Sequence, residues 1–339
     1  LYGLAIALLV YILYFGHTAM GAQRWINLGF FAFQPSELAK LIIIISLAAM
    51  LHNRKIEALL DMLPLLALIG LPFLLIAKQP DLGTALIFIF IFFSMVILAN
   101  TTSRLIFLLL SPVLSLVIFN IFPQFAHLAW IIYLVMLFAY LAVKKTPLFD
   151  TFCFMTVNVV IVWVAPLFWH FLKPYQQERL LVFIDPQIDP YAQGVRYHVD
   201  KSITAVGSGG IWGQGWMHGA LSHLQYIPVQ NSDFIFSVIG EELGLWGGFL
   251  IMLLEGTIVY RGIRIATLAK DSFGAMLAAG IAAYFLFQTV INLGMTMGIM
   301  PVVGIPLPFV SYGGSALITC LCAAGLLQSI NCRREKLFF

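Results

Sequence analysis

The sequence contains very little charge. Only 10% of its 339 residues are charged, whereas 61% are hydrophobic. Soluble domains have about 25% charged and about 45–50% apolar residues, so this chain lies far outside their range. The net charge of +3 is too small to indicate a nucleic-acid partner. The composition favours a membrane protein instead.

Metal-binding and nucleotide-binding motifs are also missing. The four cysteines form no Cys-x-x-Cys pair, which argues against zinc and against a disulfide framework. His198, His218 and His223 lack metal-ligand spacing, so we interpret them as interfacial or hydrogen-bonded residues. No Gly-Lys-Ser/Thr follows the glycine-rich stretch at 207–215, so we favour flexible packing at a membrane surface over a phosphate loop.

A cleavable signal peptide is not visible at the start of the chain. Leu1 leads directly into an apolar run that has no basic flank. Because the first residue is not Met, we expect the chain to be a fragment that lacks its true N-terminus.

Long apolar runs dominate the chain. Stretches such as LIIIISLAAML (41–51) and TALIFIFIFFSMVILA (84–99) carry no charge and approach the roughly 20 residues that cross a bilayer as a helix. Membrane β-strands would alternate apolar and polar residues instead. We therefore predict an all-α, polytopic membrane protein with about ten transmembrane helices. The apolar segments lie at about 1–16, 38–51, 62–77, 84–99, 105–122, 128–143, 151–172, 240–260, 273–295 and 313–330.

Lysine and arginine are distributed unevenly between alternate loops. Eleven of the 18 fall on one side of the predicted membrane, and four of the other seven lie in the long polar stretch at 173–232. Positive charge in short loops marks the cytoplasmic side, so we predict that both termini are cytoplasmic. Residues 17–37, 78–83, 173–232 and 296–312 then face outward. Residues 173–232 form one large extracytoplasmic loop within a single integral membrane domain, 1–339.

The first two outward loops carry polar residues just ahead of apolar segments. Gln-Pro-Ser ends at Ser36 and Gln-Pro-Asp ends at Asp81, and helix capping is the better explanation for both residues. Glu37 and Lys40 are three residues apart on one helix face and can form a pair. Lys40 would also lie about one turn into the membrane, where an ionisable residue is a candidate functional residue. The sequence leaves two alternatives equally open for Lys40, a pair with Glu37 and a functional role.

Asp233 stands where the polar loop QNSD (230–233) meets an apolar run. It can cap the following helix, or it can be a reactive carboxylate at the membrane surface. Glu241 and Glu242 follow about 12 Å further along a straight helix, and two unpaired acids at that depth are costly. We therefore expect this segment to lie along the interface or to line a polar cavity.

The last outward loop, GIMPVVGIPLPFVSYGGSA (298–316), contains three prolines that prevent a regular helix. Irregular backbone at membrane depth is tolerated only when it is buried in protein or lines a cavity. We predict that this loop forms another wall of the same cavity.

Four motifs in order resemble the SEDS family of peptidoglycan polymerases over nearly the whole chain. They are GAQRWINLGFFAFQPSELAK, KQPDLGTA, SDFIF with IGEELG, and GIMPVVGIPLPFVSYGGSA. GAQRW, GWMHGALSHLQYIP and SYGGSA are more similar to the members that serve cell elongation than to those that serve division. The resemblance implies a glycosyltransferase that polymerises lipid II on the outer face of the bacterial cytoplasmic membrane during elongation and shape maintenance. It also implies contact with membrane lipid and a class B penicillin-binding protein, a transpeptidase, as partner. A lipid II flippase and a non-catalytic scaffold of the wall-synthesis complex stay open as alternatives.

The chain departs from the usual family pattern in three places. Family members usually have two further helices before 1–16, and many have one span where we predict three between Arg104 and Lys173. The two additional spans do not change which loops face outward. Relatives commonly carry Pro-Glu in the position of Pro228-Val229, so any help that this Glu gives the aspartate is missing here.

The resemblance assigns the essential aspartate of the family to Asp233. A sugar hydroxyl is a weak nucleophile and needs a base, and partial desolvation should raise the pKa of a carboxylate into a useful range. A lipid pyrophosphate is already a good leaving group, so cations can replace the second acid that inverting glycosidases need. Arg24 and Lys40 are our candidates for these cations, and Arg196 and Lys201 are weaker ones.

The remaining candidate residues are expected to bind substrate. Trp25 could pack on lipid or sugar, although an interfacial aromatic anchor is an equal alternative. A divalent cation could assist the pyrophosphate, but we identify no metal site and expect no other cofactor. The further substrate-binding candidates are Glu37, Gln79, Asp81 and Ser311.

Overall fold

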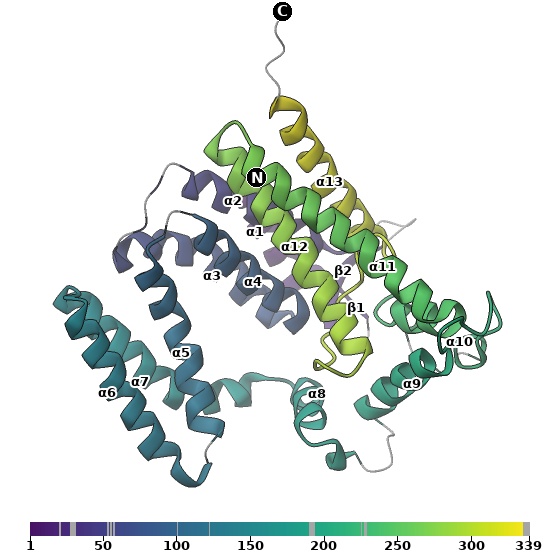
Figure 1. Ribbon diagram of the computed structural model, residues 1–339, viewed down its shortest axis with the longest axis horizontal. Helices are drawn as coiled ribbons and strands as arrows, with labels where there is room; N and C mark the ends of the chain where they lie inside the picture. Colours follow the sequence, from purple (N-terminus) through teal and green to yellow (C-terminus); the bar gives the residue numbers. More distant parts are fainter. Residues whose placement is uncertain are drawn as a thin grey trace, which may run out of the picture.

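The computed structural model describes residues 1–19, 22–27, 32–52, 54, 56, 58–99, 101–121, 123–189, 194–224, 226 and 229–334. Pro228 lies outside these residues, so of the Pro228-Val229 pair only Val229 is described. The described chain is mainly helical, with one small antiparallel sheet near the N-terminal helix (Figure 1). The strands of this sheet are β1 (His17–Ala19), β2 (Ala22–Asn27) and β3 (Ala32–Phe33).

Each apolar segment of the sequence coincides with a helix. Among the described residues, six helices are long and apolar enough to cross a membrane, which confirms a mostly helical membrane protein. Helices α1, α4 and α5 are apolar but shorter. The helices are α1 (Tyr2–Phe15), α2 (Pro35–Leu51), α3 (Leu63–Lys78), α4 (Leu82–Leu98), α5 (Ser103–Ile121), α6 (Ala126–Val143), α7 (Leu148–Phe171), α11 (Ile235–Leu268), α12 (Ser272–Thr296) and α13 (Gly314–Arg334).

Helix α12 forms the centre of the bundle. It packs against α2, α4, α11 and α13. Of its apolar membrane-spanning stretch, 72% is buried inside the protein. Small residues permit this close packing: a Cβ atom on Gly280 would lie 2.6 Å from Ile44 and 2.7 Å from Met95. Because apolar area gives no driving force between helices in lipid, such close contacts are what hold them together.

Helices α5, α6 and α7 pack mainly against one another and form a separate three-helix unit at one side of the molecule (Figure 1). Hydrogen bonds between buried polar side chains join the unit. Asn158 Nδ2 donates to Ser111 Oγ at 2.8 Å, and Trp130 Nε1 donates to Ser115 Oγ at 2.7 Å. Such bonds between helices replace water, which the lipid does not offer.

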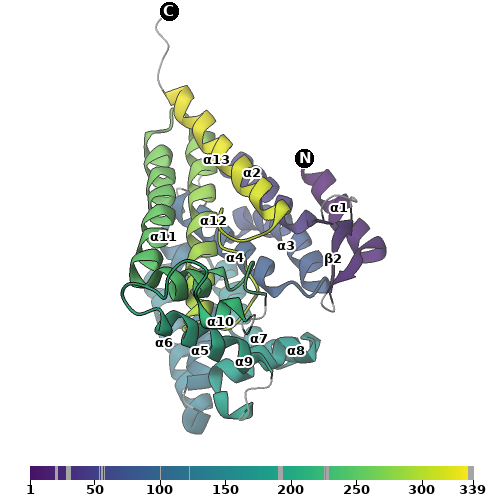
Figure 2. The ribbon, with the colours of Figure 1, turned by 90° about the vertical axis from the view of Figure 1, so that its right-hand side faces the viewer.

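In the described part of the polar stretch at 173–232, three α-helices gather at the end of the bundle away from the C-terminus (Figure 2). Ser202 of α9 is buried and connects this region to the core. Its hydroxyl group lies 2.5 Å from Ser237 Oγ and donates to the Thr296 carbonyl at 2.6 Å. The three helices are α8 (Pro174–Ile184), α9 (Val195–Ser208) and α10 (Ala220–His223).

The glycine-rich stretch at 207–215 packs directly against a break in α11. The break lies at Gly244, whose φ is 66° and ψ is −157°. The N–H of Leu245 donates to the Gly210 carbonyl at 2.9 Å, and the N–H of Gln214 donates to the Glu241 carbonyl at 3.0 Å. The stretch therefore supplies backbone partners that the break in α11 leaves free.

Flexible packing was the wrong interpretation for two of these glycines, Gly209 and Gly213. A Cβ atom on Gly209 would overlap the Gly240 carbonyl oxygen, and one on Gly213 would overlap the Glu242 carbonyl oxygen. Gly213 also has a φ of +79°, a conformation that other residues rarely adopt. Glycine is needed at these two positions because two backbones approach closely.

Two acidic residues from different parts of the chain, Glu241 and Asp81, bind backbone N–H groups. Glu241 is fully buried, and its carboxylate accepts hydrogen bonds from the N–H groups of Leu221 at 2.8 Å and Ser222 at 2.9 Å. Asp81 accepts from the N–H of Thr84 at 3.2 Å, which confirms the predicted cap of α4. Both acids thus compensate unpaired donors at the start of a helix.

Capping by Ser36 was wrong. The N-cap of α2 is Gln34, and no side chain caps this helix. Ser36 Oγ instead accepts a 3.0 Å hydrogen bond from the Gln34 side chain. Ser36 lies one position after Pro35, which occupies the first turn, so the hydroxyl group is already inside the helix.

Candidate active site

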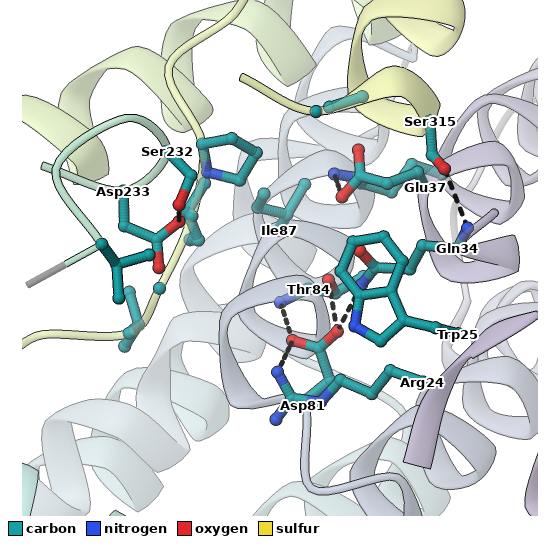
Figure 3. A pocket seen from close by; sticks show the side chains of 18 of the residues that line it. Arg24, Trp25, Gln34, Glu37, Asp81, Thr84, Ile87, Ser232, Asp233 and Ser315 are labelled. Carbon is teal, nitrogen blue, oxygen red and sulfur yellow. Dashed lines mark hydrogen bonds and ion pairs between the residues drawn. The ribbon is translucent and has the colours of Figure 1, made fainter. Parts of the chain in front are cut away.

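A polar cavity of about 350 Å³ lies where β2, α8, the N-terminal ends of α2 and α4, the turn before α11 and the irregular segment 303–306 meet. Asp233 and Ser232 lie on one side of this cavity, and Arg24, Trp25, Glu37 and Asp81 lie on the other (Figure 3). Its other lining residues are Gln34, Lys40, Thr84, Ile87, Tyr175, Arg179, Val229, Val303, Gly304, Ile305, Pro306, Tyr312, Gly313, Ser315 and Ala316.

Asp233 does not cap α11. The N-cap of that helix is Phe234, and it receives no side-chain cap. The Asp233 carboxylate instead lines the cavity and accepts a 3.3 Å hydrogen bond from Ser232 Oγ. Burial raises the pKa of Asp233 above its usual value of 3.8, and the charge of Asp81 raises it further. The Ser232 hydrogen bond and the cations Arg179 and Arg24 oppose this shift.

Arg179 lines the cavity but was not among the cations predicted from the sequence. It projects from α8 into the cavity, and its Nη1 donates to the Val302 carbonyl at 3.4 Å. In the described part of the chain, no carboxylate oxygen lies within 4.0 Å of its nitrogens. Burial lowers the pKa of the Arg179 guanidinium, while the nearby Asp233 charge raises it. Its cationic group is therefore only partly compensated and available to an anion.

Arg24 reaches the cavity from β2 and contacts the turn at Gln79, Pro80 and Asp81. Its guanidinium donates to the carbonyl groups of Gln79, at 3.2 Å, and Pro80, and lies 3.8 Å from Asp81 Oδ1. The Gln79 side chain points elsewhere, because its Nε2 donates to the Leu9 carbonyl at 2.9 Å. Arg24 and Asp81 are thus in the cavity, whereas the Gln79 side chain lies behind it.

Glu37 and Lys40 form the predicted pair. Lys40 Nζ donates to Glu37 Oε1 at 2.8 Å, and the two residues are 1% and 3% exposed, respectively. The ammonium group also lies 5.3 Å from the centre of the Tyr284 ring. Glu37 Oε2 has no hydrogen-bond partner among the described residues. Pairing is therefore established, and a role in substrate binding stays a prediction.

Three other predicted residues do not line the cavity. Arg196 binds Asp200 at 3.2 Å, and Lys201 lies over the rings of Tyr197 and Tyr226. The Ser311 hydroxyl group donates to the Ser232 carbonyl at 2.6 Å, so it holds the cavity wall from behind. Trp25, by contrast, lines the cavity.

Among the described residues, no group of three or more His, Cys, Asp or Glu side chains is arranged to hold a metal ion. Val229, where relatives were expected to carry Glu, lines the cavity with an aliphatic side chain. Among the described residues, Asp233 is therefore the one acid that lines its side of the cavity. Glu37 and Asp81 line the opposite side (Figure 3).

The fold and the cavity define a polytopic helical membrane protein with a buried polar site. The family model for FtsW, RodA and SpoVE cell cycle proteins matches residues 1–130 and 112–336. The chain belongs to this family, which is the SEDS family that the four motifs resemble.

The more similar relatives carry the RodA and MrdB names. The chain is 37% identical to peptidoglycan glycosyltransferase RodA of Treponema pallidum, over 97% of this chain and 81% of that one. It is 36% identical to peptidoglycan glycosyltransferase MrdB of Escherichia coli K12, over 99% of this chain and 78% of that one.

Solved structures agree with these relatives. RodA of Thermus thermophilus matches with a TM-score of 0.59 and 26% identity, over 99% of this chain and 77% of that one. A chain of a peptidoglycan synthase complex, described as coordinating polymerization and crosslinking, matches with a TM-score of 0.67 and 31% identity, over 99% and 80%. The predicted similarity to the elongation members of the family is confirmed.

Proposed function

We propose that the protein is a peptidoglycan glycosyltransferase of the RodA type, which polymerises lipid II into glycan strands. The names of the relatives at 36–37% identity support the reaction, and the polar cavity supplies a site for it. The observation that carries the proposal is the Asp233 carboxylate, which lines the cavity and caps no helix.

Asp233 acts as the general base in this proposal. The hydroxyl group of the acceptor sugar loses its proton to the carboxylate as its oxygen attacks the anomeric carbon of the donor. Because burial raises the pKa of Asp233, the carboxylate accepts this proton more readily than an exposed aspartate would. The bond between the anomeric carbon and the pyrophosphate oxygen breaks in the same step, and the lipid pyrophosphate leaves with the electron pair.

Cations at the cavity stabilise the negative charge that develops on the leaving pyrophosphate. Arg179 suits this role best, because its guanidinium lines the cavity without a close carboxylate partner in the described chain. Arg24 assists from the opposite side, although it is partly compensated by Asp81. Lys40 and Glu37 bind polar groups of the substrate, and Trp25 packs on its sugar or lipid.

The topology completes the proposal. Ten helices cross the bacterial cytoplasmic membrane as one integral domain, with both termini in the cytoplasm. The basic residues of alternate loops support this orientation. Residues 173–232 then belong to the outer side, and the cavity opens where lipid II is polymerised. The partner is a class B penicillin-binding protein, consistent with the synthase complex that shares this fold.

The test uses the protein purified from membranes and incubated with lipid II. Asp233→Asn should lower glycan polymerisation to a small residual rate, because an amide cannot accept the proton. The variant should be at least as stable as the wild type, since burial disfavours the charge that it removes. Asp200→Asn is the matched control, because Asp200 pairs with Arg196 outside the cavity. Normal polymerisation by folded Asp233→Asn protein would exclude the proposed base, and lipid II translocation without polymerisation by the wild type would favour a flippase.

A further inference from the structure

Asn292 of α12 connects the two walls of the cavity. The residue is 0% exposed, and its Nδ2 donates to the backbone carbonyl of Asp233 at 2.9 Å and to that of Ile305 at 2.7 Å. Asp233 belongs to the turn before α11, and Ile305 belongs to the irregular segment 301–307. One side-chain amide therefore fixes the distance between the two segments.

Among the described residues, the Asn292 side-chain amide makes no other hydrogen bond that would explain its position. A side-chain amide group has two N–H donors, and both are used by these carbonyl groups. Asn292 Oδ1 is buried and has no hydrogen-bond partner in the described part of the chain. Leaving a buried acceptor unpaired is unfavourable, so the contacts to the two carbonyl groups are what this asparagine provides.

Gln288, one turn earlier on α12, makes a related contact without touching Asp233. Its Nε2 donates to the Pro306 carbonyl at 2.8 Å, and its Oε1 also has no partner among the described residues. Both residues are fully buried. Gln288 thus supports the segment 301–307 alone, whereas Asn292 supports this segment and Asp233 together.

Three consecutive carbonyl groups ahead of α11 are held by hydrogen bonds. The Tyr312 N–H donates to Asn231 at 2.8 Å, and the Ser311 hydroxyl donates to Ser232 at 2.6 Å. These two donors come from the irregular loop after residue 300. Only the third donor, Asn292, comes from a regular helix, and that helix is the buried centre of the bundle. The Asp233 peptide is therefore held in place by α12.

We propose that Asn292 is a positioning residue. It holds the Asp233 carboxylate at a fixed position relative to Gly304 and Arg179, which also line the cavity. This inference rests on the proposed function of Asp233 as the base. Gly304 follows directly in the segment that Asn292 holds, and a Cβ atom there would lie 3.2 Å from Asp233 Oδ2 and 3.8 Å from Arg179 Nη1. A base that shifts by about 1 Å loses about 10²-fold in rate, so this register matters for catalysis.

The test compares Asn292→Leu with Gln288→Met in purified, membrane-derived protein that polymerises lipid II. Both changes keep the approximate side-chain size and remove the amide donor. We expect Asn292→Leu to lower kcat roughly 10- to 100-fold with KM within about twofold of the wild type. Gln288→Met should lower the thermal unfolding temperature but reduce kcat clearly less than Asn292→Leu, because it leaves the hydrogen bond to the Asp233 carbonyl in place. Equal kcat losses in both variants, or a wild-type kcat in folded Asn292→Leu, would overturn the inference.

Two further readouts separate positioning from a purely structural role. In the Asp233→Asn background, adding Asn292→Leu should leave the residual rate unchanged, because both changes remove the same contribution. The acid limb of the rate profile should move to lower pH in Asn292→Leu, since a released Asp233 is better hydrated. The groups that face Asp233, namely Ser232, Arg179, Asp81 and Arg24, are unchanged in this variant.

Asn292→Ser keeps one donor and provides a second variant if Asn292→Leu does not fold. Its kcat should fall between those of the wild type and the Asp233→Asn protein, and a wild-type kcat would contradict the inference. A wild-type protein that makes no glycan, or an Asp233→Asn protein that makes it at the wild-type rate, would instead remove the proposed function. The two failures are therefore distinguishable.

Discussion

Gly304 lies directly against the Asp233 carboxylate. A Cβ atom on Gly304 would be 3.2 Å from Asp233 Oδ2, a distance that is tighter than ordinary van der Waals contact. The φ of Gly304 is +72°, where residues other than glycine are strained. Glycine at this position therefore leaves the space beside the carboxylate open, where the proposed acceptor hydroxyl group would approach.

Gly304→Ala should lower the rate of lipid II polymerisation. The methyl group would crowd the carboxylate, and the left-handed conformation would add strain of about 1–2 kcal/mol. We expect kcat to fall roughly 10- to 100-fold, as for other small displacements of reacting groups. Gly256→Ala is the matched control, because a Cβ atom there meets nothing within 4 Å and its φ is not positive. If both variants retain wild-type kcat, the carboxylate is not approached from the Gly304 side.

Replacing Arg179 should remove stabilisation of the leaving pyrophosphate. Arg179→Gln is expected to lower kcat about 10²- to 10³-fold, the usual effect of losing one group that stabilises transition-state charge. Arg196→Gln should have little effect, because Arg196 binds Asp200 outside the cavity. Initial rates with purified lipid II measure both variants. Similar losses in the two would indicate a general effect of positive charge on lipid binding.

The pH dependence of the rate should shift in opposite directions in two variants. Asp233 must be ionised to act as the base, and burial raises its pKa above the usual 3.8. As the pH decreases, the wild-type rate should therefore begin to fall at a pH higher than 3.8. The charge of Asp81 raises the pKa of Asp233, so Asp81→Asn should move the acid limb to lower pH. Arg179 lowers the pKa of Asp233, so Arg179→Gln should move the residual activity to higher pH. Asparagine also caps helices well, so Asp81→Asn keeps the start of α4. A shift in the same direction in both variants would rule out these charges as the cause.

The sequence was sufficient to predict much of this site because its residues are unusual for a membrane. Asp233 adjoins an apolar run, and the prolines of 298–316 interrupt one, so both features required a cavity. The helices could be predicted because the apolar runs approach the length that crosses a bilayer. Ser36 was misassigned because Pro35 occupies the first turn of α2 and moves the N-cap back to Gln34.

Residues in polar or regular segments could not be selected in the same way. Arg179 lies in a polar stretch where an arginine is ordinary, and only the packing of α8 brings it to Val302 and the cavity. Asn292 is a polar residue inside an apolar helix, which was an available signal. Its two acceptors, however, are backbone carbonyl groups from distant segments, and no sequence pattern identifies them.

The Glu37 and Lys40 pair separates stability from catalysis most clearly. Lys40→Met would leave the Glu37 carboxylate buried without its 2.8 Å partner, and breaking a buried pair in this way costs about 3–5 kcal/mol. The double variant Glu37→Gln/Lys40→Met carries no unpaired charge, so it should recover most of the lost thermal stability. If the pair binds substrate, the double variant should still polymerise lipid II poorly, with a raised KM. Thermal unfolding and initial rates on the same preparations measure the two effects, and a stable double variant with wild-type KM would show that the pair is structural alone.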